Sequence, residues 1–498
     1  MSERKVVSGF FWVFGERITA QFVSFVVSVV LARILLPSEY GVIALIIVFI
    51  NIANVFVVSG LSTSLIQKKD ANEEDFSTIF YCSLILSVLI YILLWFAAPF
   101  IADFYNSPHL TAYVRVFSIK ILVSSYNSIQ HAYVSRHMIF KKFFIATLFG
   151  TIISAFVGIG MAYMGFGAWS IIGQYLTNTV IDTLVLAVIL PWRPRRMFNW
   201  KSAKSLISYG WKVLATDLLG TVFVNLRSLL LGKVYTTADL AYYNKGQQFP
   251  QLIGNNLDAT ITTVLFPAMS NKNDSTVEVR ILTRRAIRIA SYLIYPILGG
   301  LIAVAQPLVV VLLTEKWKPC IFFFQMLCIS QGLTTVSNLN LQALKAIGRS
   351  DVTLKLEFVK KPVYLLFLVA GMYYSTYAVV ISMVLYSFVG TTINILPNAK
   401  HLSYTFKEQL IDILPAVLVS AAVVAAALPL TLLPLNNYLI LAMQIVVGAG
   451  VYVALSILFK VDSFFYLIGV ARSFLKVKSK KQTEQTKHET KEAVGIED

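Results

Sequence analysis

The stretch STIFYCSLILSVLIYILLWFAAPFIA, residues 77–102, decides the fold class of this chain. It contains no charged residue and is longer than the roughly 20 apolar residues that a helix needs to cross the hydrocarbon core of a bilayer. Similar stretches recur along all 498 residues, of which 57% are hydrophobic and 13% are charged, and the mean hydropathy is +0.72. No ordinary soluble domain has this composition, so the chain is predicted to be an all-α, polytopic membrane protein.

About fourteen candidate transmembrane helices can be placed, and the connections between them are short. They lie at approximately residues 9–33, 41–66, 77–102, 112–135, 143–164, 168–191, 206–232, 240–268, 288–313, 320–344, 354–374, 376–397, 410–434 and 437–459. The short connections exclude catalysis in a large extramembrane domain. Glu16 and Arg17 interrupt the first span, and no small-residue cleavage site follows it, so this span is predicted to be a retained helix and not a signal peptide.

Basic residues are distributed unevenly between the two sets of loops. If the N-terminus is cytoplasmic, the loops on the opposite side carry only Arg33, Lys233, Lys316 and Lys318. The positive-inside rule therefore predicts a multi-pass protein with cytoplasmic N- and C-termini. The net charge of +17 follows from this topology, and no nucleic-acid partner is needed to explain it.

A weak internal repeat divides the first twelve spans into two sets of six. A shift of 200 positions aligns residues 31–34 (LARI) with 231–234 (LGKV), and a shift of 211 aligns Asn127 with Asn338. Both copies would begin in the cytoplasm, as in transporters that are built from parallel repeats and alternate access between two halves. The predicted domains are an N-terminal six-helix lobe at 1–198, a C-terminal six-helix lobe at 199–400, two additional transmembrane helices at 401–460, and an interfacial amphipathic helix with a disordered tail at 461–498.

Six basic residues lie inside predicted spans, where few acidic residues are present to neutralise them. They are Arg17, Arg115, Lys120, Lys212, Arg227 and Lys245. A charge at the bilayer centre costs several kcal/mol, so it is found mostly where it faces a partner or a wet cavity. Each of the six could instead extend to a lipid headgroup or pair with a carboxylate such as Glu16 or Asp217. For the whole set, we favour a cationic chamber that binds an anion.

Uncharged polar residues also recur at helical spacing inside several spans. In the eighth span, Gln248, Gln251, Asn255 and Asp258 follow one another at three- and four-residue steps and therefore share one helix face. Two interpretations remain open: hydrogen bonds between helices, which typically contribute about 1 kcal/mol or less per pair, or the wall of a hydrophilic cavity. The residues predicted to line such a cavity are Gln21, Asn127, His131, Gln248, Gln251, Asn255 and Asn338.

The sequence indicates no metal site and no cofactor. It has no Walker lysine loop, no zinc-type spacing of His and Cys, and no serine elbow. Its three cysteines lie in or beside spans, which favours packing over a disulfide framework. Glu16, Asp217 and Asp258 are candidates for ion coupling, whereas Glu39 and Asp103 are expected to cap helices.

Several motifs between residues 32 and 349 resemble the polysaccharide transporter family of lipid-linked oligosaccharide flippases. They are ARILLPSEYG at 32–41, GLSTSLIQK at 60–68, YYNK at 242–245, LFPA at 265–268, EKW at 315–317 and QALKAIGR at 342–349. The resemblance implies the fold shared with multidrug extruders and lipid II flippases. It also implies that an undecaprenyl-diphosphate-linked oligosaccharide is turned across a bacterial inner membrane, with Arg17 and Lys245 near the diphosphate. A polysaccharide polymerase and export machinery are further partners that it suggests.

Three alternatives remain. A cation-coupled drug extruder of the same superfamily would favour an anionic chamber, whereas the predicted chamber is cationic. A membrane-embedded glycan polymerase would be expected to have a large external loop, which the sequence lacks. A scaffold for glycan assembly would not need polar stripes inside the bilayer.

Overall fold

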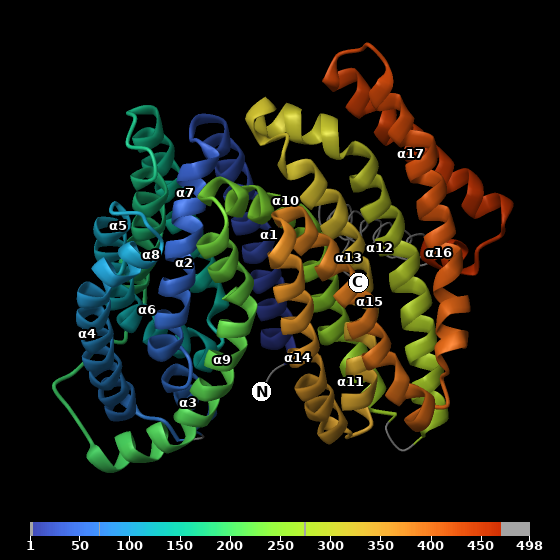
Figure 1. The fold of residues 1–498 in the computed structure, drawn as a ribbon. Coiled ribbons are helices and arrows are strands. Elements are labelled where there is room, and N and C mark those ends of the chain that lie inside the picture. Colours follow the sequence, from blue (N-terminus) through green and yellow to red (C-terminus); the bar gives the residue numbers. More distant parts are fainter. Residues whose placement is uncertain (1–2, 69, 273–274, 470–498) are drawn as a thin grey trace, which may run out of the picture. The chain divides into compact units, whose positions relative to one another are not determined.

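The computed structural model describes residues 3–68, 70–272 and 275–469, and every regular element in this part of the chain is a helix (Figure 1). The all-α prediction is confirmed. The helices are α1 (Glu3–Ile34), α2 (Pro37–Val58), α3 (Leu61–Gln67), α4 (Glu73–Phe104), α5 (Leu110–Phe117), α6 (Ile119–His137), α7 (Phe140–Tyr163), α8 (Trp169–Ile189), α9 (Trp200–Val234), α10 (Thr237–Thr260), η1 (Ile261–Leu265), α11 (Phe266–Ser270), α12 (Thr276–Leu313), η2 (Glu315–Trp317), α13 (Cys320–Ala346), α14 (Ser350–Tyr374), α15 (Thr376–His401), α16 (Phe406–Ala427), η3 (Leu428–Leu432) and α17 (Asn437–Leu458).

Each predicted span coincides with one helix or with consecutive helices, but the number fourteen is not confirmed. In the described part of the chain, ten helical stretches are long and apolar enough to cross a membrane. The predicted span at 9–33 contains a shorter apolar helical stretch, Thr19–Ile34, and the predicted spans at 112–135, 240–268 and 354–374 are helical without meeting that criterion. For these last three, the physical reason is their content of charged and amide side chains, such as Lys120 in α6 and Lys245 in α10.

Three predicted spans are interrupted helices. The second divides into α2 and α3 at Gly60, whose φ of +82° is a conformation that favours glycine. A Cβ atom at Gly60 would also clash with the carbonyl oxygen of Gly210 in α9, so glycine permits close packing there. The fourth span divides into α5 and α6 at Ser118, and the eighth passes through the π-helix η1 before α11.

The described helices form two compact units by their internal contacts. The first comprises Met1–Asn244 with Leu312–Pro319, and the second comprises Lys245–Val311 with Cys320–Asp498. The boundary therefore falls inside α10, and α9 belongs to the first unit. The division of the sequence into lobes at 198, and the repeat on which it rests, stay predictions.

In the first unit, two of the family-like motifs pack against each other. The indole Nε1 of Trp317 donates a hydrogen bond to Ala32 O at 2.8 Å, and Lys316 Nζ donates to Arg33 O and Leu35 O, both at 2.8 Å. The α1 carbonyls near its C-terminal end have no partner within their own helix, and these side chains satisfy them. The ring of Tyr40 contacts Trp317 edge to face at 5.4 Å. The segment 312–319 is thereby held against the end of α1.

The motif at 32–41 also contains a helix cap that the sequence predicts. Glu39 lies in the first turn of α2, and its Oε2 accepts a hydrogen bond from Leu36 N at 2.7 Å. A carboxylate at this place is stabilised both by the free N–H groups of the first turn and by the helix dipole. The predicted capping role of Glu39 is confirmed.

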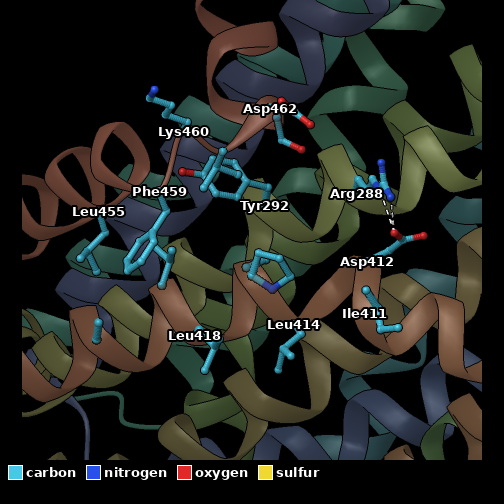
Figure 2. Close-up of a pocket in the computed structure, with 16 residues that line it drawn as sticks. Arg288, Tyr292, Ile411, Asp412, Leu414, Leu418, Leu455, Phe459, Lys460 and Asp462 are labelled. Carbon is cyan, nitrogen blue, oxygen red and sulfur yellow. Dashed lines mark hydrogen bonds and ion pairs between the residues drawn. The ribbon is translucent and has the colours of Figure 1, made fainter.

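In the second unit, the buried carboxylate of Asp412 joins α16 to α12. It accepts hydrogen bonds from Arg284 Nε at 2.7 Å and from the hydroxyl of Tyr404 at 2.7 Å. It also accepts one from Arg288 Nε at 2.8 Å (Figure 2). Its side chain is only 1% exposed, whereas those of Arg284 and Arg288 are 35% and 44% exposed. Two cations on one helix therefore share one carboxylate on another.

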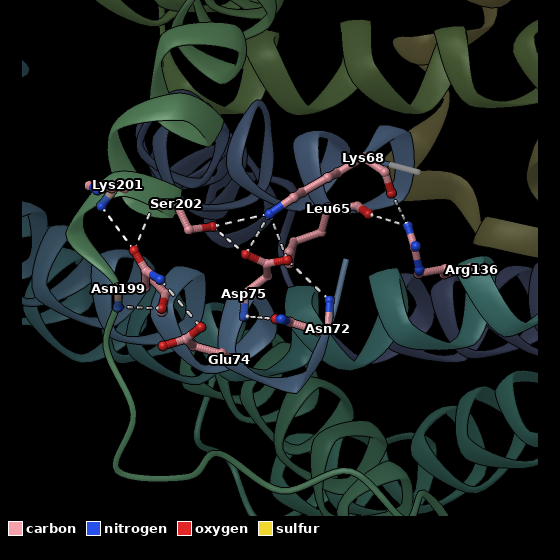
Figure 3. A network of polar contacts seen from close by, with 10 residues as sticks. Leu65, Lys68, Asn72, Glu74, Asp75, Arg136, Asn199, Lys201 and Ser202 are labelled. Carbon is pink, nitrogen blue, oxygen red and sulfur yellow. Dashed lines mark hydrogen bonds and ion pairs between the residues drawn. The ribbon is translucent and has the colours of Figure 1, made fainter. Parts of the chain in front are cut away.

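Around the linker between the predicted lobes, the chain forms a polar network in the first unit (Figure 3). Asp75, in the first turn of α4, is paired with Lys68 at 2.7 Å and accepts a hydrogen bond from Ser202 in α9. Asn72 and Asp75 form a capping box, with Asp75 N donating to Asn72 Oδ1 at 2.9 Å. The start of α4 is thus fixed to the start of α9.

The linker itself is attached to the same helix end. Arg195 forms an ion pair with Glu73 at 2.7 Å, and its backbone N donates to the hydroxyl of Ser77 at 3.1 Å. Asn199 caps α9 by accepting from Lys201 N at 3.0 Å, and its Nδ2 donates to Glu74 at 3.3 Å. This connection between the predicted lobes is therefore held in place by α4.

Residues 462–469, after α17, are helical. The predicted interfacial helix extends to 478, and its part from 470 onward lies outside the described residues. Its interfacial location stays a prediction. Cys82, Cys320 and Cys328 are not joined in disulfides, as their positions predict.

Candidate functional site

The polar residues that the sequence singles out lie mostly on the helices that are least apolar. Glu16, Arg17 and Gln21 are in α1, Arg115 is in α5, Lys120, Asn127 and His131 are in α6, and Lys245, Gln248, Gln251, Asn255 and Asp258 are in α10. Lys212, Asp217 and Arg227 are in α9, and Asn338 is in α13. For Glu16 and Arg17 the structure describes the helix but not the side chains, so their predicted roles lie outside the described part.

Lys245 is buried in the second unit, with 5% of its surface exposed. Its Nζ donates a hydrogen bond to Gln248 Oε1, one turn along α10, at 3.3 Å. The neighbouring Gly246 explains this burial, because a Cβ atom there would lie 2.8 Å from the backbone N of Phe324 in α13. The two helices therefore pack closely beside a lysine whose charge is costly to bury.

The C-terminal part of α10 and the following η1 form hydrogen bonds to α13. Asn338 Nδ2 donates to Asp258 Oδ2 at 2.7 Å, and Gln342 Nε2 donates to the hydroxyl of Thr262 at 3.2 Å. The other oxygen of Asp258, Oδ1, is buried and has no hydrogen-bond partner among the described residues. These contacts are hydrogen bonds between helices, and the predicted role of Asn338 in lining a cavity stays a prediction.

Gln251 and Asn255 differ from their neighbours on α10, because both are exposed. The polar face that the sequence presents as one stripe therefore has two parts. Lys245, Gln248, Asp258 and Asn338 are engaged inside the second unit, whereas the two exposed amides remain accessible to a solute. Exposed amides midway along a helix are unfavourable against lipid, so they indicate a hydrated surface.

In the first unit, the polar face of α6 meets a carboxylate that sequence reasoning missed. Asn127 Nδ2 donates to Asp182 Oδ2 at 2.7 Å, and His131 Nε2 lies 3.1 Å from the same oxygen. Asp182 is buried on α8. One signal could have found it: it is the single charged residue in the predicted span 168–191. The structure thus brings Asn127 and His131 together, around an acid.

The cations of α5 and α6 contact aromatic rings. Lys120 Nζ lies 5.3 Å from the ring centre of Tyr175 and 5.9 Å from that of Phe117, and its side chain is half-buried. The guanidinium of Arg115 lies over the ring of Trp95 at 4.6 Å, and its Nε donates to Trp95 O at 3.2 Å. Such cation–π contacts compensate part of the lost hydration.

Pro99 explains why that carbonyl accepts a side-chain donor. It lies inside α4, four residues after Trp95, and a proline has no N–H to bond to the carbonyl of residue i−4. Arg115 supplies the missing donor. This contact gives Arg115 a structural task that is independent of any ligand.

A polar groove lies between α2 and α9 in the first unit. Its volume is about 490 Å³, and its polar lining residues are Asn51, Ser59, Thr216, Asp217, Thr221 and Asn225. Asp217 is exposed, as is Lys212 on the same helix, whereas Arg227 lies over the ring of Tyr243 at 4.9 Å. Of the predicted residues in α9, only Asp217 lines this groove; Asn225, which is also a lining residue, donates to Thr221 O.

Comparisons with known proteins place this fold and these polar helices in a family. The family model described as "Polysaccharide biosynthesis protein" matches residues 30–322, which is more than half of the chain. The chain belongs to this family. The predicted resemblance is confirmed.

Two relatives show how far this polysaccharide biosynthesis protein is similar to others. The lipopolysaccharide biosynthesis protein WzxC of Escherichia coli (strain K12) is 23% identical over 74% of this chain and 75% of its own length. The teichuronic acid biosynthesis protein TuaB of Bacillus subtilis (strain 168) is 25% identical over 60% of this chain and 62% of its own length.

Two solved structures show the fold. The lipid II flippase MurJ, in an inward closed conformation, matches with a TM-score of 0.73 and 14% identity, over 92% of this chain and 99% of that chain. A multidrug resistance transporter of the MATE family, in an inward-facing conformation, matches with a TM-score of 0.61 and 15% identity, over 77% of this chain and 94% of that chain. This family member is therefore a multi-pass membrane protein with a fold that flippases and drug transporters share.

Proposed function

We propose that the protein is a flippase that turns an undecaprenyl-diphosphate-linked oligosaccharide from the cytoplasmic to the outer leaflet of a bacterial inner membrane. It would act by alternating access, with both termini in the cytoplasm, and without a catalytic step of its own. A polysaccharide polymerase and the export machinery would use the product. The finer parts of this proposal go beyond the family and the fold.

The observation that carries the proposal is that a member of a polysaccharide biosynthesis family exposes polar side chains midway along membrane-length helices. Lys212 and Asp217 are exposed in α9, and Gln251 and Asn255 are exposed in α10. A charged glycan headgroup cannot cross hydrocarbon unaided, and a protein surface with fixed polar groups can replace its lost hydration. The polyprenyl tail would stay in lipid.

We assign the diphosphate to Arg17 and Lys245. Both are cations on the less apolar helices, and a phosphate forms strong charge-assisted hydrogen bonds with such groups. Lys120, Lys212 and Arg227 would add to a cationic chamber, whereas Arg115 already has Trp95 as its partner. Lys245 would exchange its contact with Gln248 for the phosphate when the substrate binds.

Transfer assays in inverted membrane vesicles, with defined lipid-linked glycans, test this proposal. Arg17→Ala and Lys245→Met should each abolish transport without lowering the amount of protein in the membrane. Lys245→Met keeps most of the side-chain volume, so a loss of transport would report the charge. Lys204→Ala is the matched control, since Lys204 is an exposed lysine near the start of α9 and should be dispensable. Normal transport by both Arg17→Ala and Lys245→Met would refute the assignment.

A further inference from the structure

The second unit contains a groove that the proposed transport does not use. It lies between α12, α16, α17 and the segment that follows α17, and its volume is about 750 Å³ (Figure 2). This is within the range of sites that hold small molecules. All its lining residues belong to this one unit.

The groove has an apolar wall and a charged end. Its apolar lining residues are Ile411, Leu414, Pro415, Ala416, Leu418, Val419, Ala422, Leu455, Phe459 and Val461. Leu414, Leu418 and Phe459 are 51%, 59% and 68% exposed, so their side chains are not covered by the protein. The charged residues that line the groove, which we call its charged end, are Arg288 and Lys460 together with Asp412 and Asp462.

The charged end coincides with the edge of the hydrocarbon. The α12 helix has four arginines between residues 280 and 288 and no charged residue from Ile289 to its end at Leu313. Likewise, no charged residue occurs between Asp412 in α16 and Lys460 after α17. Three chain segments thus change from charged to apolar at this groove, as expected where hydrocarbon meets headgroups.

At this end of the groove, positively charged side chains outnumber negatively charged ones. Asp412 is shared by Arg284 and Arg288, so these three residues carry one net positive charge. Arg288 uses Nε and Nη2 for Asp412, and its Nη1 has no hydrogen bond among the described residues. Lys460 and Asp462 are both exposed and cancel each other in charge. The guanidinium of Arg285, one turn away from Arg288, lies over the ring of Tyr466 at 4.3 Å from the ring centre.

From this arrangement we infer that the groove is a binding site for an anionic membrane phospholipid, whose phosphate contacts Arg288 and Lys460 and whose acyl chain lies along Leu414 and Leu418. A basic pocket between transmembrane helices at a headgroup level is suited to anionic lipids. Guanidinium and ammonium groups form charge-assisted hydrogen bonds with phosphate, and the exposed leucines offer the chain an apolar surface. The lipid is a resident ligand, and this inference does not depend on the transported substrate.

Native mass spectrometry of the full-length protein tests the site, using mixed micelles that contain phosphatidylglycerol and phosphatidylethanolamine in equal amounts. Phosphatidylglycerol should be retained preferentially by the wild type. Lys460→Gln should lower retention of phosphatidylglycerol about tenfold, since a hydrogen bond to a charged group is worth roughly 1.5–3 kcal/mol. Ala422→Phe should lower retention by filling the apolar wall while leaving every charge in place. Arg285→Gln removes a cation from outside the groove and should change nothing.

Three outcomes would overturn the inference. The first is retention of phosphatidylethanolamine at the same level as phosphatidylglycerol, since the net charge would then have no effect. The second is wild-type retention by both Lys460→Gln and Ala422→Phe, since the lipid would then lie elsewhere. The third is displacement of phosphatidylglycerol by undecaprenyl phosphate but not by excess phospholipid, which would assign the groove to a prenyl lipid. Neither Lys460→Gln nor Ala422→Phe removes a contact of Asp412, so folding should be retained.

Discussion

Replacing Asp412 by Asn should destabilise the second unit, because the two arginines that share this carboxylate would lose their counter-charge. The Asn amide is nearly isosteric, but it places an NH₂ donor against donors from Arg284, Arg288 and Tyr404. Removing one partner of a buried ion pair typically costs about 3–5 kcal/mol. The arginines are 35% and 44% exposed, so water screens the charges left behind, and the lower limit of about 3 kcal/mol is expected.

The size of the thermal shift shows how much of the chain unfolds together. With an unfolding entropy of about 2.1 cal/mol/K per residue, 498 residues that unfold as one unit give a decrease in Tm of about 3 °C. If the second unit, about half of the chain, unfolds alone, the decrease is about 6 °C. The assay is thermal unfolding of purified protein in detergent, followed by tryptophan fluorescence at a fixed scan rate.

The control is Glu278→Gln, also in α12, which removes an exposed ion pair with Lys272 in the connection before this helix and should leave the Tm nearly unchanged. Replacing Asp412, Arg284 and Arg288 together with Leu, Met and Met should restore much of the lost stability, because no buried charge would remain unpaired. A Tm of Asp412→Asn equal to that of the wild type would refute the reasoning.

Three further results are expected. Arg115→Ala should lower the free energy of unfolding by about 1 kcal/mol, because the Trp95 carbonyl, which Pro99 leaves without a backbone donor, loses its partner. The transport rate per folded molecule should not change. A loss of transport at normal stability would instead give Arg115 a role in binding the substrate. Outward movement of a dianionic headgroup is favoured by about 2.3 kcal/mol per charge per 100 mV of inside-negative potential. The transport rate in vesicles with clamped Na⁺ and pH gradients should therefore increase with the voltage. A transport rate that does not depend on the voltage, but that Asp258→Asn abolishes, would support ion antiport. Deletion of residues 462–498 should leave some transport, and unfolding of the truncated protein would show that this segment belongs to the core.

The sequence predicted elements and faces well, because both depend on local periodicity. The approximate positions of the helical spans, the cap at Glu39 and the polar faces of α6 and α10 follow from local sequence patterns. Which residue each face meets depends on packing between distant segments. Spacing alone therefore did not show that Asn127 and His131 contact Asp182, and their predicted role in lining a cavity stays a prediction.

The six basic residues inside the predicted spans also show that local sequence patterns do not predict contacts between distant segments. The sequence identified them correctly as unusual, since each interrupts an apolar stretch. It gave no sign that Pro99 would free a carbonyl for Arg115, or that Gly246 would let α13 close over Lys245. The helix breaks at Gly60 and Ser118 were missed for a related reason: hydrophobicity continues across them, while the backbone turns.

The anchored linker changes where movement between the two units can originate. Residues 195–199 are fixed to α4, so this connection cannot serve as a slack tether. The chain instead passes between the units at residues 244–245, 311–312 and 319–320, and the first two of these points lie inside the continuous helices α10 and α12. Pro250, shortly after the first point, removes one backbone hydrogen bond from α10 and makes it easier to bend. In the alternating access proposed above, the two units would therefore move by bending of these continuous helices, as in an elastic flexure, and not about a loose joint.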